Sequence, residues 1–161
     1  MKRNRELKIV REEFDSVAEL AQEDQELLRR AQECCSAAYA PYSGFHVGAA
    51  LRMEDGTIET GSNQENSAYP SGLCAERVAI FHASAKYPDK QFRTIAIAAR
   101  RKDEVAFLPV TPCGSCRQVL AEYEHKQEQS IRLIMQYPED KVTILQSVSD
   151  LLPFVFTKDS L

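Results

Sequence analysis

The first quarter of the chain carries a long helical pattern. Apolar residues recur at intervals of three and four between Val17 and Ala38, a spacing that places them on one face of an α-helix. Ser16 followed by Glu19 forms a capping-box pattern for the start of this helix, and Pro41 marks its end. The pattern therefore predicts one amphipathic helix that covers an apolar surface elsewhere in the protein.

The segments that follow show the two-residue alternation of β-strands. Alternating apolar residues from Phe45 to Met53 predict a strand, and Asp55 with Gly56 is a two-residue turn signal. Residues 57–60 can then return as the hairpin partner of that strand. Further strands are predicted at residues 92–99, 131–135 and 142–145.

Two more helices complete the predicted set of elements. Residues 75–86 are helical in composition and stop before Pro88. Thr111 is the expected N-cap of a helix that has Pro112 in its first position and continues to about Glu124. Five strands with three helices predict an α/β fold, a three-layer α/β/α sandwich around a five-stranded mixed sheet. Because no repeat or linker divides the chain, we expect a single domain over residues 1–161.

Residues 1–14 differ from the rest because charged side chains dominate them. We interpret them as a solvated, charged N-terminal extension, with a short added strand as the alternative. The start of the chain lacks the apolar core of a signal peptide, and the longest apolar runs are far too short to cross a bilayer. These features predict a soluble, cytoplasmic protein with no membrane partner.

The overall charge narrows the class of partner. A formal net charge of −4 and a pI near 5.5 argue against a nucleic-acid partner, since binding a phosphate backbone depends on clustered Lys and Arg. A small-molecule substrate fits this composition better. Five cysteines, an odd number, in a chain predicted to be intracellular favour reduced ligands or core residues over a disulfide framework.

Three of those cysteines carry the strongest chemical signal. Cys113 and Cys116 stand three apart at a predicted helix start, and Cys74 lies near the start of another helix. Helix N-termini lower thiol pKa values toward the thiolate form that binds metal. Three thiolates can hold a zinc ion and leave its fourth position open to water. A C-x-x-C pair alone would equally suit a redox pair or half of a structural site, so the third cysteine is what favours a catalytic zinc site.

Two neighbours of Cys74 fit such a site. Glu76 lies about 200° around the helix from Cys74, so it suits a place beside the metal, where it can move protons of a bound water, better than direct ligation. Arg77 can donate to the sulfurs and offset the negative charge that three thiolates leave on zinc. Their ordinary interpretations are an acidic residue at a helix N-terminus and a surface arginine.

The remaining cysteines and the histidines compete weakly as metal ligands. Cys34 and Cys35 lie on the apolar stripe of the first helix, so we expect core residues there, although they are the main rival ligands. His82 is roughly 12 Å along the helix from Cys74, and His46 alternates with Phe45 on a strand. We interpret these two and His125 as structural or surface residues.

At this point a family resemblance becomes visible. The chain closely resembles the small homotetrameric cytidine deaminases over about residues 16–156. The motifs that carry the resemblance are Pro41-Tyr42-Ser43-Gly44-Phe45 with the following residues to Leu51, Asn63-Gln64-Glu65-Asn66, Cys74-Ala75-Glu76-Arg77, and Pro112-Cys113-Gly114-Ser115-Cys116-Arg117-Gln118. They occur in the family's order and at approximately its spacing. Gln64 departs from the pattern, because the family usually has an apolar residue there.

The resemblance implies a role for each matching residue. Cys74, Cys113 and Cys116 would ligate zinc, one ion per subunit, and Glu76 would be the proton shuttle. Phe45 would lie against the pyrimidine, Asn63 and Glu65 would bind the ribose hydroxyls, and backbone groups around Ala75 would hold the base edge. Tyr69 and Phe156 would complete a neighbouring subunit's site in a homotetramer. On the residues alone, Asn63 to Asn66 is a polar loop, and Phe45 and Phe156 are packing residues.

The resemblance implies hydrolytic deamination of cytidine and deoxycytidine in pyrimidine salvage. A deaminase of another cytosine nucleoside, such as blasticidin S, is the nearest alternative, and Glu65 favours an ordinary nucleoside over it. A polynucleotide editor fits less well, for want of a basic surface. From a different class, a structural zinc module that binds a partner protein would have Cys34 or Cys35 as a fourth thiolate.

Overall fold

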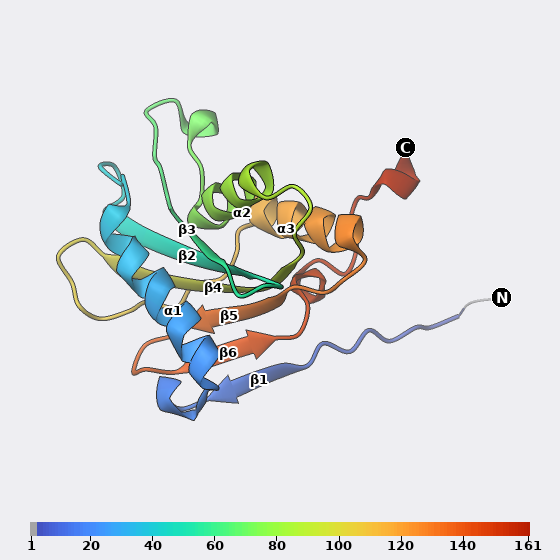
Figure 1. Cartoon of the computed structure of the whole chain (residues 1–161), viewed down its shortest axis with the longest axis horizontal. Helices are drawn as coiled ribbons and strands as arrows, with labels where there is room; N and C mark the ends of the chain where they lie inside the picture. Colours follow the sequence, from blue (N-terminus) through green and yellow to red (C-terminus); the bar gives the residue numbers. More distant parts are fainter. Residues whose placement is uncertain (1–2) are drawn as a thin grey trace.

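The computed structural model describes residues 3–161, and within this range six strands form one mixed sheet (Figure 1). The strands lie in the order β1-β6-β5-β4-β2-β3. Only the β4–β5 pair among these described strands is parallel. The strand bounds are β1 Arg11–Phe14, β2 Phe45–Met53, β3 Ile58–Ser62, β4 Phe92–Arg101, β5 Arg132–Gln136 and β6 Val142–Leu145.

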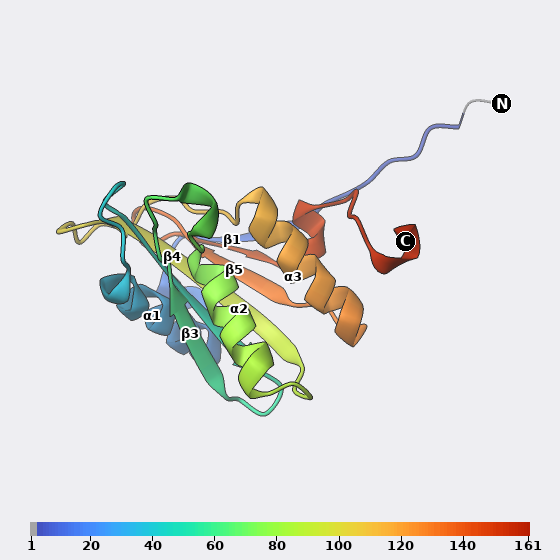
Figure 2. The ribbon, with the colours of Figure 1, turned by 90° about the horizontal axis from the view of Figure 1, so that it is seen from above.

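Helices cover both faces of this sheet. α1 (Gln22–Cys34) lies on one face, and α2 (Ala75–Lys86) and α3 (Gly114–Gln127) lie side by side on the other (Figures 1 and 2). The predicted three-layer α/β/α sandwich is therefore confirmed, with six strands instead of the expected five. No helix in residues 3–161 has the length and apolar character needed to cross a membrane.

The central strand β4 shows why its sequence is apolar almost without interruption. Ile95 and Ile97 belong to the apolar cluster beneath α2 and α3, whereas Ala96 and Ala98 belong to the cluster beneath α1. Each of these four side chains is fully buried. A strand that is covered on both faces needs apolar residues at every position, so the pattern predicted this strand correctly.

The sixth strand comes from the charged N-terminal segment. β1 pairs antiparallel with β6, from Arg11 opposite Leu145 to Phe14 opposite Val142. The alternative interpretation, a short added strand, therefore holds for residues 11–14, whereas residues 3–10 are exposed and extend away from the sheet (Figure 1). The alternation in Arg11–Phe14 is weak, since three of its four side chains are exposed, and the sequence offered little signal for it.

The long helix predicted between Ser16 and Pro41 is divided in the structure. Ser16 caps only a 3₁₀ turn, Val17–Glu19, by accepting a hydrogen bond from the backbone N of Ala18, and α1 begins at Gln22. The turn is held by the β5–β6 connection, because the backbone N of Val17 donates to the carbonyl oxygen of Asp140 at 3.1 Å. This tertiary contact interrupts a helical pattern that is continuous in the sequence.

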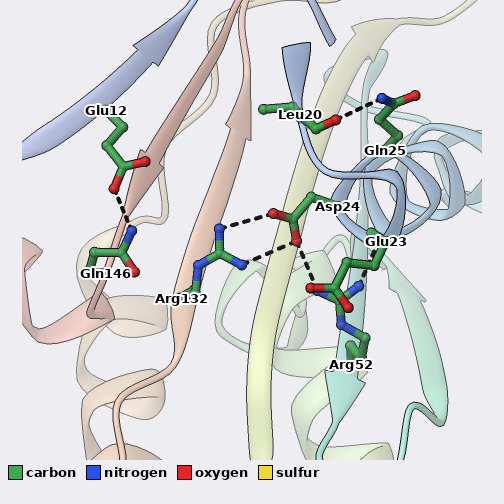
Figure 3. Close-up of polar contacts among 8 residues, drawn as sticks. All are labelled: Glu12, Leu20, Glu23, Asp24, Gln25, Arg52, Arg132 and Gln146. Atoms are coloured by element: carbon green, nitrogen blue, oxygen red, sulfur yellow. Dashed lines mark hydrogen bonds and ion pairs between the residues drawn. The ribbon is translucent and has the colours of Figure 1, made fainter. Parts of the chain in front are cut away.

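A buried ionic network anchors the start of α1. Asp24, only 3% exposed, accepts hydrogen bonds from Arg52 Nη2 of β2 at 2.8 Å and from both terminal nitrogens of Arg132 of β5 at 3.0 and 3.2 Å (Figure 3). Gln25 Nε2 also donates to the carbonyl oxygen of Leu20 at 2.8 Å. The Asp24 carboxylate therefore connects α1 to the C-terminal end of β2 and to the start of β5.

The start of α3 differs from the prediction. Cys113 is the N-cap and the helix begins at Gly114, so Thr111 and Pro112 precede it in non-helical conformation. Arg117 Nε donates to the carbonyl oxygen of Pro112 at 2.8 Å, which holds the segment before the helix. The predicted capping role of Thr111 is wrong, and the helix ends at Gln127, three residues beyond the expected Glu124.

Candidate functional site

Two helix N-termini bring the three predicted thiols together. Cys74 is the N-cap of α2, Cys113 is the N-cap of α3, and Cys116 lies in the first turn of α3. The three sulfur atoms lie within 4.8 Å of one another, and the Sγ atoms of Cys74 and Cys113 are 3.7 Å apart. Tetrahedral zinc with Zn–S bonds of about 2.3 Å separates its sulfurs by about 3.8 Å, so the donor set fits this ion.

The chemistry of the thiols also suits a cation. The hydrogen bond with Cys116, then contacts with Arg77 and Cys113, lower the pKa of the Cys74 thiol to about 5 against the opposing effect of burial. Interaction with Cys74, together with burial, raises the pKa of the Cys116 thiol. Such a pair favours one proton shared between two sulfurs. A divalent cation that binds thiolates competes directly with that proton.

Glu76 lies in the first turn of α2, beside the cysteine cluster. Its side chain is only 4% exposed, and both Glu76 and Cys74 line the same cavity. Burial, the largest effect, raises the pKa of this carboxyl group to about 7. A buried carboxyl group that opens onto a candidate metal site is well placed to exchange protons with a ligand there.

Arg77 lies where the sequence analysis expected it. Its Nη2 atom is 3.7 Å from the sulfur of Cys74, and its side chain also lines the cavity. A guanidinium group at this position favours the thiolate form of Cys74. The same positive charge offsets part of the negative charge that three thiolates bring to a divalent ion.

The cavity beside the cysteines has a volume of about 330 Å³, a size suited to a small molecule. Four of the predicted substrate-binding residues line it: Phe45, Asn63, Glu65 and Tyr69. Ala75 is fully buried behind the cavity wall, and Phe156 lies outside the wall on the C-terminal segment, where it is 59% exposed. The structure of one chain therefore brings together most, but not all, of the predicted set.

The Asn63 side chain forms hydrogen bonds with the backbone of the cavity wall. Its Oδ1 atom accepts a hydrogen bond from the backbone N of Val47 at 2.8 Å, and its Nδ2 atom donates to the carbonyl oxygen of Phe45 at 2.9 Å. The amide therefore holds the start of β2, from which the Phe45 side chain enters the cavity wall. Nδ2 carries two hydrogens, so one remains for a ligand.

Glu65 organises the turn that precedes β2. Its carboxylate accepts hydrogen bonds from the backbone N of Tyr42 at 2.9 Å, from the backbone N of Ser43 at 3.3 Å and from the Ser43 hydroxyl. The hydrogen bond from the Ser43 hydroxyl is the main reason why the pKa of Glu65 lies below its usual range. The side chain is therefore a fixed anion at the mouth of the cavity.

Several cavity residues were not predicted as site residues. Tyr42, Gln64 and Asn66 belong to the polar segments that were singled out, so their proximity to the motifs was an available signal. Val110 and Thr111 also line the cavity, directly before Pro112. Apolar or uncharged residues of this kind give no chemical signal in a sequence, and only the fold brings them to the wall.

The rival ligands lie elsewhere. The sulfur of Cys35 contacts the carbonyl oxygen of Ala98 at 3.3 Å within the cluster beneath α1, so the sheet separates it from α2 and α3. His46 Nδ1 lies 3.1 Å from the carbonyl oxygen of Cys35, and His82 and His125 lie beside Glu59 and Asp159, respectively. This placement agrees with their interpretation as structural or surface residues, and it separates Cys35 from the cysteine cluster.

Comparison with known proteins gives a consistent family assignment. Residues 21–129 match the family model described as the cytidine and deoxycytidylate deaminase zinc-binding region. A cytidine deaminase from Sporosarcina psychrophila is 39% identical over 137 residues, which cover 85% of this chain and 93% of the relative. A blasticidin-S deaminase from Bacillus cereus is 35% identical over 107 residues, covering 65% of this chain and 75% of the relative.

Solved structures give the same result. The crystal structure of cytidine deaminase from Burkholderia pseudomallei has a TM-score of 0.70 and 36% identity, and the match covers 81% of this chain and 97% of that chain. The crystal structure of cytidine deaminase from Mycobacterium tuberculosis has a TM-score of 0.62 and 31% identity, with 81% and 94% covered. The match therefore includes nearly the full length of these relatives.

Proposed function

From the premise that this chain belongs to the family of cytidine and deoxycytidylate deaminases, we propose that it hydrolyses cytidine and deoxycytidine to uridine and deoxyuridine, with release of ammonia. The observation that carries the proposal is the meeting of three cysteine sulfurs and a buried carboxyl group at one cavity of nucleoside size. The reaction is one of pyrimidine salvage. A cytoplasmic location stays a prediction.

The zinc-binding region of the family supplies the metal chemistry. We propose Cys74, Cys113 and Cys116 as the ligands of a single Zn²⁺ ion, which would act as a Lewis acid and turn water into a nucleophile at neutral pH. Arg77 would then partly balance the charge of the thiolates through its contact with Cys74. These roles are supported by the position of all three cysteines at the N-terminal ends of α2 and α3, where the helix dipole favours negative charge.

Glu76 would manage the protons of the reaction. The water oxygen forms a bond to the ring carbon that carries the amine, and the bond between that carbon and the amine nitrogen breaks. Of the two water protons, Glu76 would deliver one to the adjacent ring nitrogen and the other to the departing amine, which leaves as ammonia. Its side chain is buried beside Cys74 and lines the cavity, so the carboxyl group faces the proposed site instead of the protein surface.

The cavity walls would hold the nucleoside. We propose that Phe45 packs against the pyrimidine ring, and that Asn63 and Glu65 bind the ribose hydroxyls. Ala75 lies in the first turn of α2, where backbone N–H groups have no partner within the helix and can bind the edge of the base. The hydrogen-bonding groups of a sugar and a cytosine match the donors and acceptors of these residues.

We also propose that the whole chain is one domain and that four copies assemble with shared active sites. Tyr69, 81% exposed, and Phe156, 59% exposed, are large aromatic residues that one chain leaves uncovered. In such an assembly Tyr69 and Phe156 would complete a neighbouring subunit's cavity. The single sheet that runs through the described residues supports the single-domain proposal.

A substitution of Glu76 tests the proposed chemistry. Glu76→Gln removes the titrating group and keeps the size of the side chain, so we expect zinc content to be retained while turnover of cytidine falls on the order of 10²–10⁴-fold. Glu26→Gln, which changes an exposed carboxylate on α1, is the matched control and should leave both quantities unchanged. If Glu76→Gln keeps its zinc and most of its turnover, the proton-shuttle assignment is wrong.

An ammonia-release assay tests the substrate class. Cytidine, deoxycytidine, blasticidin S and a short single-stranded oligonucleotide are compared, each with and without a chelator. We expect chelator-sensitive release from the two nucleosides. Release from blasticidin S alone would favour the second candidate, which the Bacillus cereus relative supports, over an ordinary nucleoside deaminase.

A further inference from the structure

We propose that Gly61 of β3 is a positioning residue for the candidate metal centre, because the missing side chain lets α2 lie close enough to the sheet for Cys74 to meet Cys113 and Cys116. The inference rests on the proposed function, since it concerns the site of that reaction. It adds a residue that does not line the cavity and is not one of the three proposed metal ligands.

The space at Gly61 is set by the backbone of α2. A Cβ atom at this position would lie 2.4 Å from the backbone N of Ala79 and 2.6 Å from the carbonyl oxygen of Ala75. Real Cβ atoms essentially never come this close to other heavy atoms. Because both neighbours are helix backbone, no side-chain rotation can relieve the clash. The helix would have to move by about 1 Å to reach an ordinary contact distance.

The requirement at Gly61 is for space and not for an unusual backbone conformation. The described glycines with positive φ are Gly44 and Gly56, so the backbone of Gly61 is one that alanine also adopts. The residue is buried in the sheet and paired with Ala49 of β2. A substitution by alanine therefore tests the distance between β3 and α2 directly.

The point of contact lies at the functional end of the helix. Ala75 is the first residue of α2 and stands between Cys74 and Glu76, and Ala79 follows one turn later. A shift of this turn would carry Cys74 and Glu76 with it. Cys113 and Cys116 belong to α3 and would stay in place, since the three closest atoms to a Cβ at Gly61 all belong to α2. Cys74 would then be displaced away from the sheet relative to Cys113 and Cys116, and the three sulfurs would no longer surround one point.

Metal sites tolerate little displacement of this kind. Zinc–ligand distances in proteins stay within about 0.2 Å of their ideal values, and a misplacement of about 1 Å can reduce catalysis on the order of 10²-fold. The close approach at Gly61 therefore determines whether the α2 half of the site meets the α3 half. A glycine in the middle of a strand would otherwise weaken that strand, so it needs a compensating reason.

The chain offers a matched control on the other face of the same sheet. A Cβ atom at Gly48 of β2 would lie 2.0 Å from the carbonyl oxygen of Ala31 and 2.7 Å from the backbone N of Cys35, which belong to α1 and the turn after it. Gly48 pairs with Ser62, the residue next to Gly61. The two glycines thus face the same kind of clash, but α1 carries none of the proposed ligands.

The experiment compares Gly61→Ala with Gly48→Ala in the full-length protein. Folding is followed by circular dichroism and thermal unfolding, and zinc affinity is measured by competition with a chromogenic chelator at a temperature where each variant is folded. We expect both variants to lose thermal stability. Only Gly61→Ala should lose zinc affinity, on the order of 10–100-fold, and it should lower kcat for cytidine more than it raises KM.

Two outcomes would overturn the proposal. Zinc binding by Gly61→Ala that is as tight as in the unsubstituted protein would show that α2 is not held at a critical distance. An equal loss in Gly48→Ala would show a general effect of lower stability. If Gly61→Ala does not fold, Ala79→Ser adds one atom at a fully buried position in the same part of α2, with the equally buried Ala31→Ser as its control on α1, and the same pair of results is expected.

Failure of the proposed function gives a different pattern. An unsubstituted protein that binds zinc and releases no ammonia from any cytosine compound would contradict the deaminase proposal. The zinc affinities of the two glycine variants would still differ as described if Gly61 sets the position of α2. Zinc affinity, measured without any substrate, therefore tests the positioning role of Gly61 independently of the proposed deaminase reaction.

Discussion

The five cysteines show how position in the fold sets the chemistry of one residue type. Cys35 is fully buried beneath α1, and this burial raises the pKa of its thiol to about 11. Burial also raises the pKa of Cys34. Cys74 lies at a helix N-terminus beside Cys116, Cys113 and Arg77, where its pKa falls to about 5. Thiols of the first kind stay protonated, whereas the second kind is ready to bind a cation.

This contrast predicts a selective loss of zinc. Cys116→Ser removes one of three proposed ligands, so we expect the purified protein to contain little zinc or to release it at chelator concentrations that leave the unsubstituted protein loaded. Cys35→Ser is the control at an equally buried cysteine and should keep its zinc. Metal content by atomic emission and the thiolate-to-metal absorption of the cobalt-substituted protein measure both variants.

Three other results of these measurements would contradict the assignment of three cysteine ligands. Full zinc occupancy in Cys116→Ser would contradict the three-thiolate assignment. Zinc loss in Cys35→Ser, with the fold intact by circular dichroism, would favour the alternative of a structural zinc site with four thiolate ligands. A cobalt spectrum with four sulfur ligands would do the same, because such a site has no position left for water.

At the residue scale, the sequence predicted the reactive side chains better than the hydrogen bonds that hold the cavity wall in place. Cysteine spacing and the adjacent carboxyl group pointed to the cluster because few other functions need those residue types together. The bonds from Asn63 to Val47 and Phe45, and from Glu65 to the turn before β2, join segments about 20 residues apart. A single sequence contains no signal for such pairs, since any of many polar residues could make them.

At the scale of elements, the hydrophobic patterns predicted strands well where helices cover both faces of the sheet. They failed to predict helix boundaries that depend on a single tertiary contact. β4, β5 and β6 were predicted to within about two residues because their apolar runs are covered on both faces, and β2 was predicted from its two-residue alternation. The division of the first helix depends on Asp140, which lies more than 120 residues away. The start of α3 depends on Cys113 serving as the N-cap, a role that Thr111 would ordinarily fill.

The ionic anchor of α1 leads to a prediction about stability. Asp24 is 3% exposed and is the shared acceptor for Arg52 and Arg132, so Asp24→Ala leaves two guanidinium groups facing each other without their carboxylate. Removing one partner of a buried ion pair costs about 3–5 kcal/mol. We expect Asp24→Ala to lower the free energy of unfolding by this amount in urea titrations followed by circular dichroism.

The adjacent Glu23 supplies the control. Its side chain is 69% exposed and lies 3.9 Å from Arg52, so Glu23→Ala should change the free energy of unfolding by less than about 1 kcal/mol. Zinc affinity should be unchanged in both variants while they are folded, because α1 lies on the face opposite the cysteines. Equal stabilities for the two variants would contradict an anchoring role for Asp24.

At the scale of the whole molecule, the N-terminal segment is an addition to the edge of the sheet. β1 precedes residues 21–129, which match the family model, and it pairs with β6 at the edge opposite β3. All four residues of β6 are buried, and Phe14 packs against the apolar cluster beneath α1. An uncovered strand edge with apolar side chains favours association with other chains, so β1 protects this edge.

Two truncations separate the strand from the extension before it. A chain that begins at residue 11 loses only part of the extension, whose residues 3–10 are exposed, and should keep its melting temperature. A chain that begins at residue 15 also loses β1 and with it the Phe14 contact and the pairing with β6. The lost burial and hydrogen bonds amount to at least about 2 kcal/mol, which lowers Tm by about 4–8 °C at this chain length.

The same truncations test whether the effect of removing β1 is confined to the edge of the sheet. The cavity is lined by residues of β2 and of the segment after β3, and three strands separate β2 from β1 in the sheet. Both shortened chains should therefore bind zinc and release ammonia from cytidine while folded. The chain without β1 should in addition aggregate at lower protein concentrations, as measured by light scattering, because the edge of β6 is uncovered. If both chains melt at the same temperature and remain equally dispersed, β1 does not hold the edge of the sheet in solution, and residues 11–14 belong with the solvated extension.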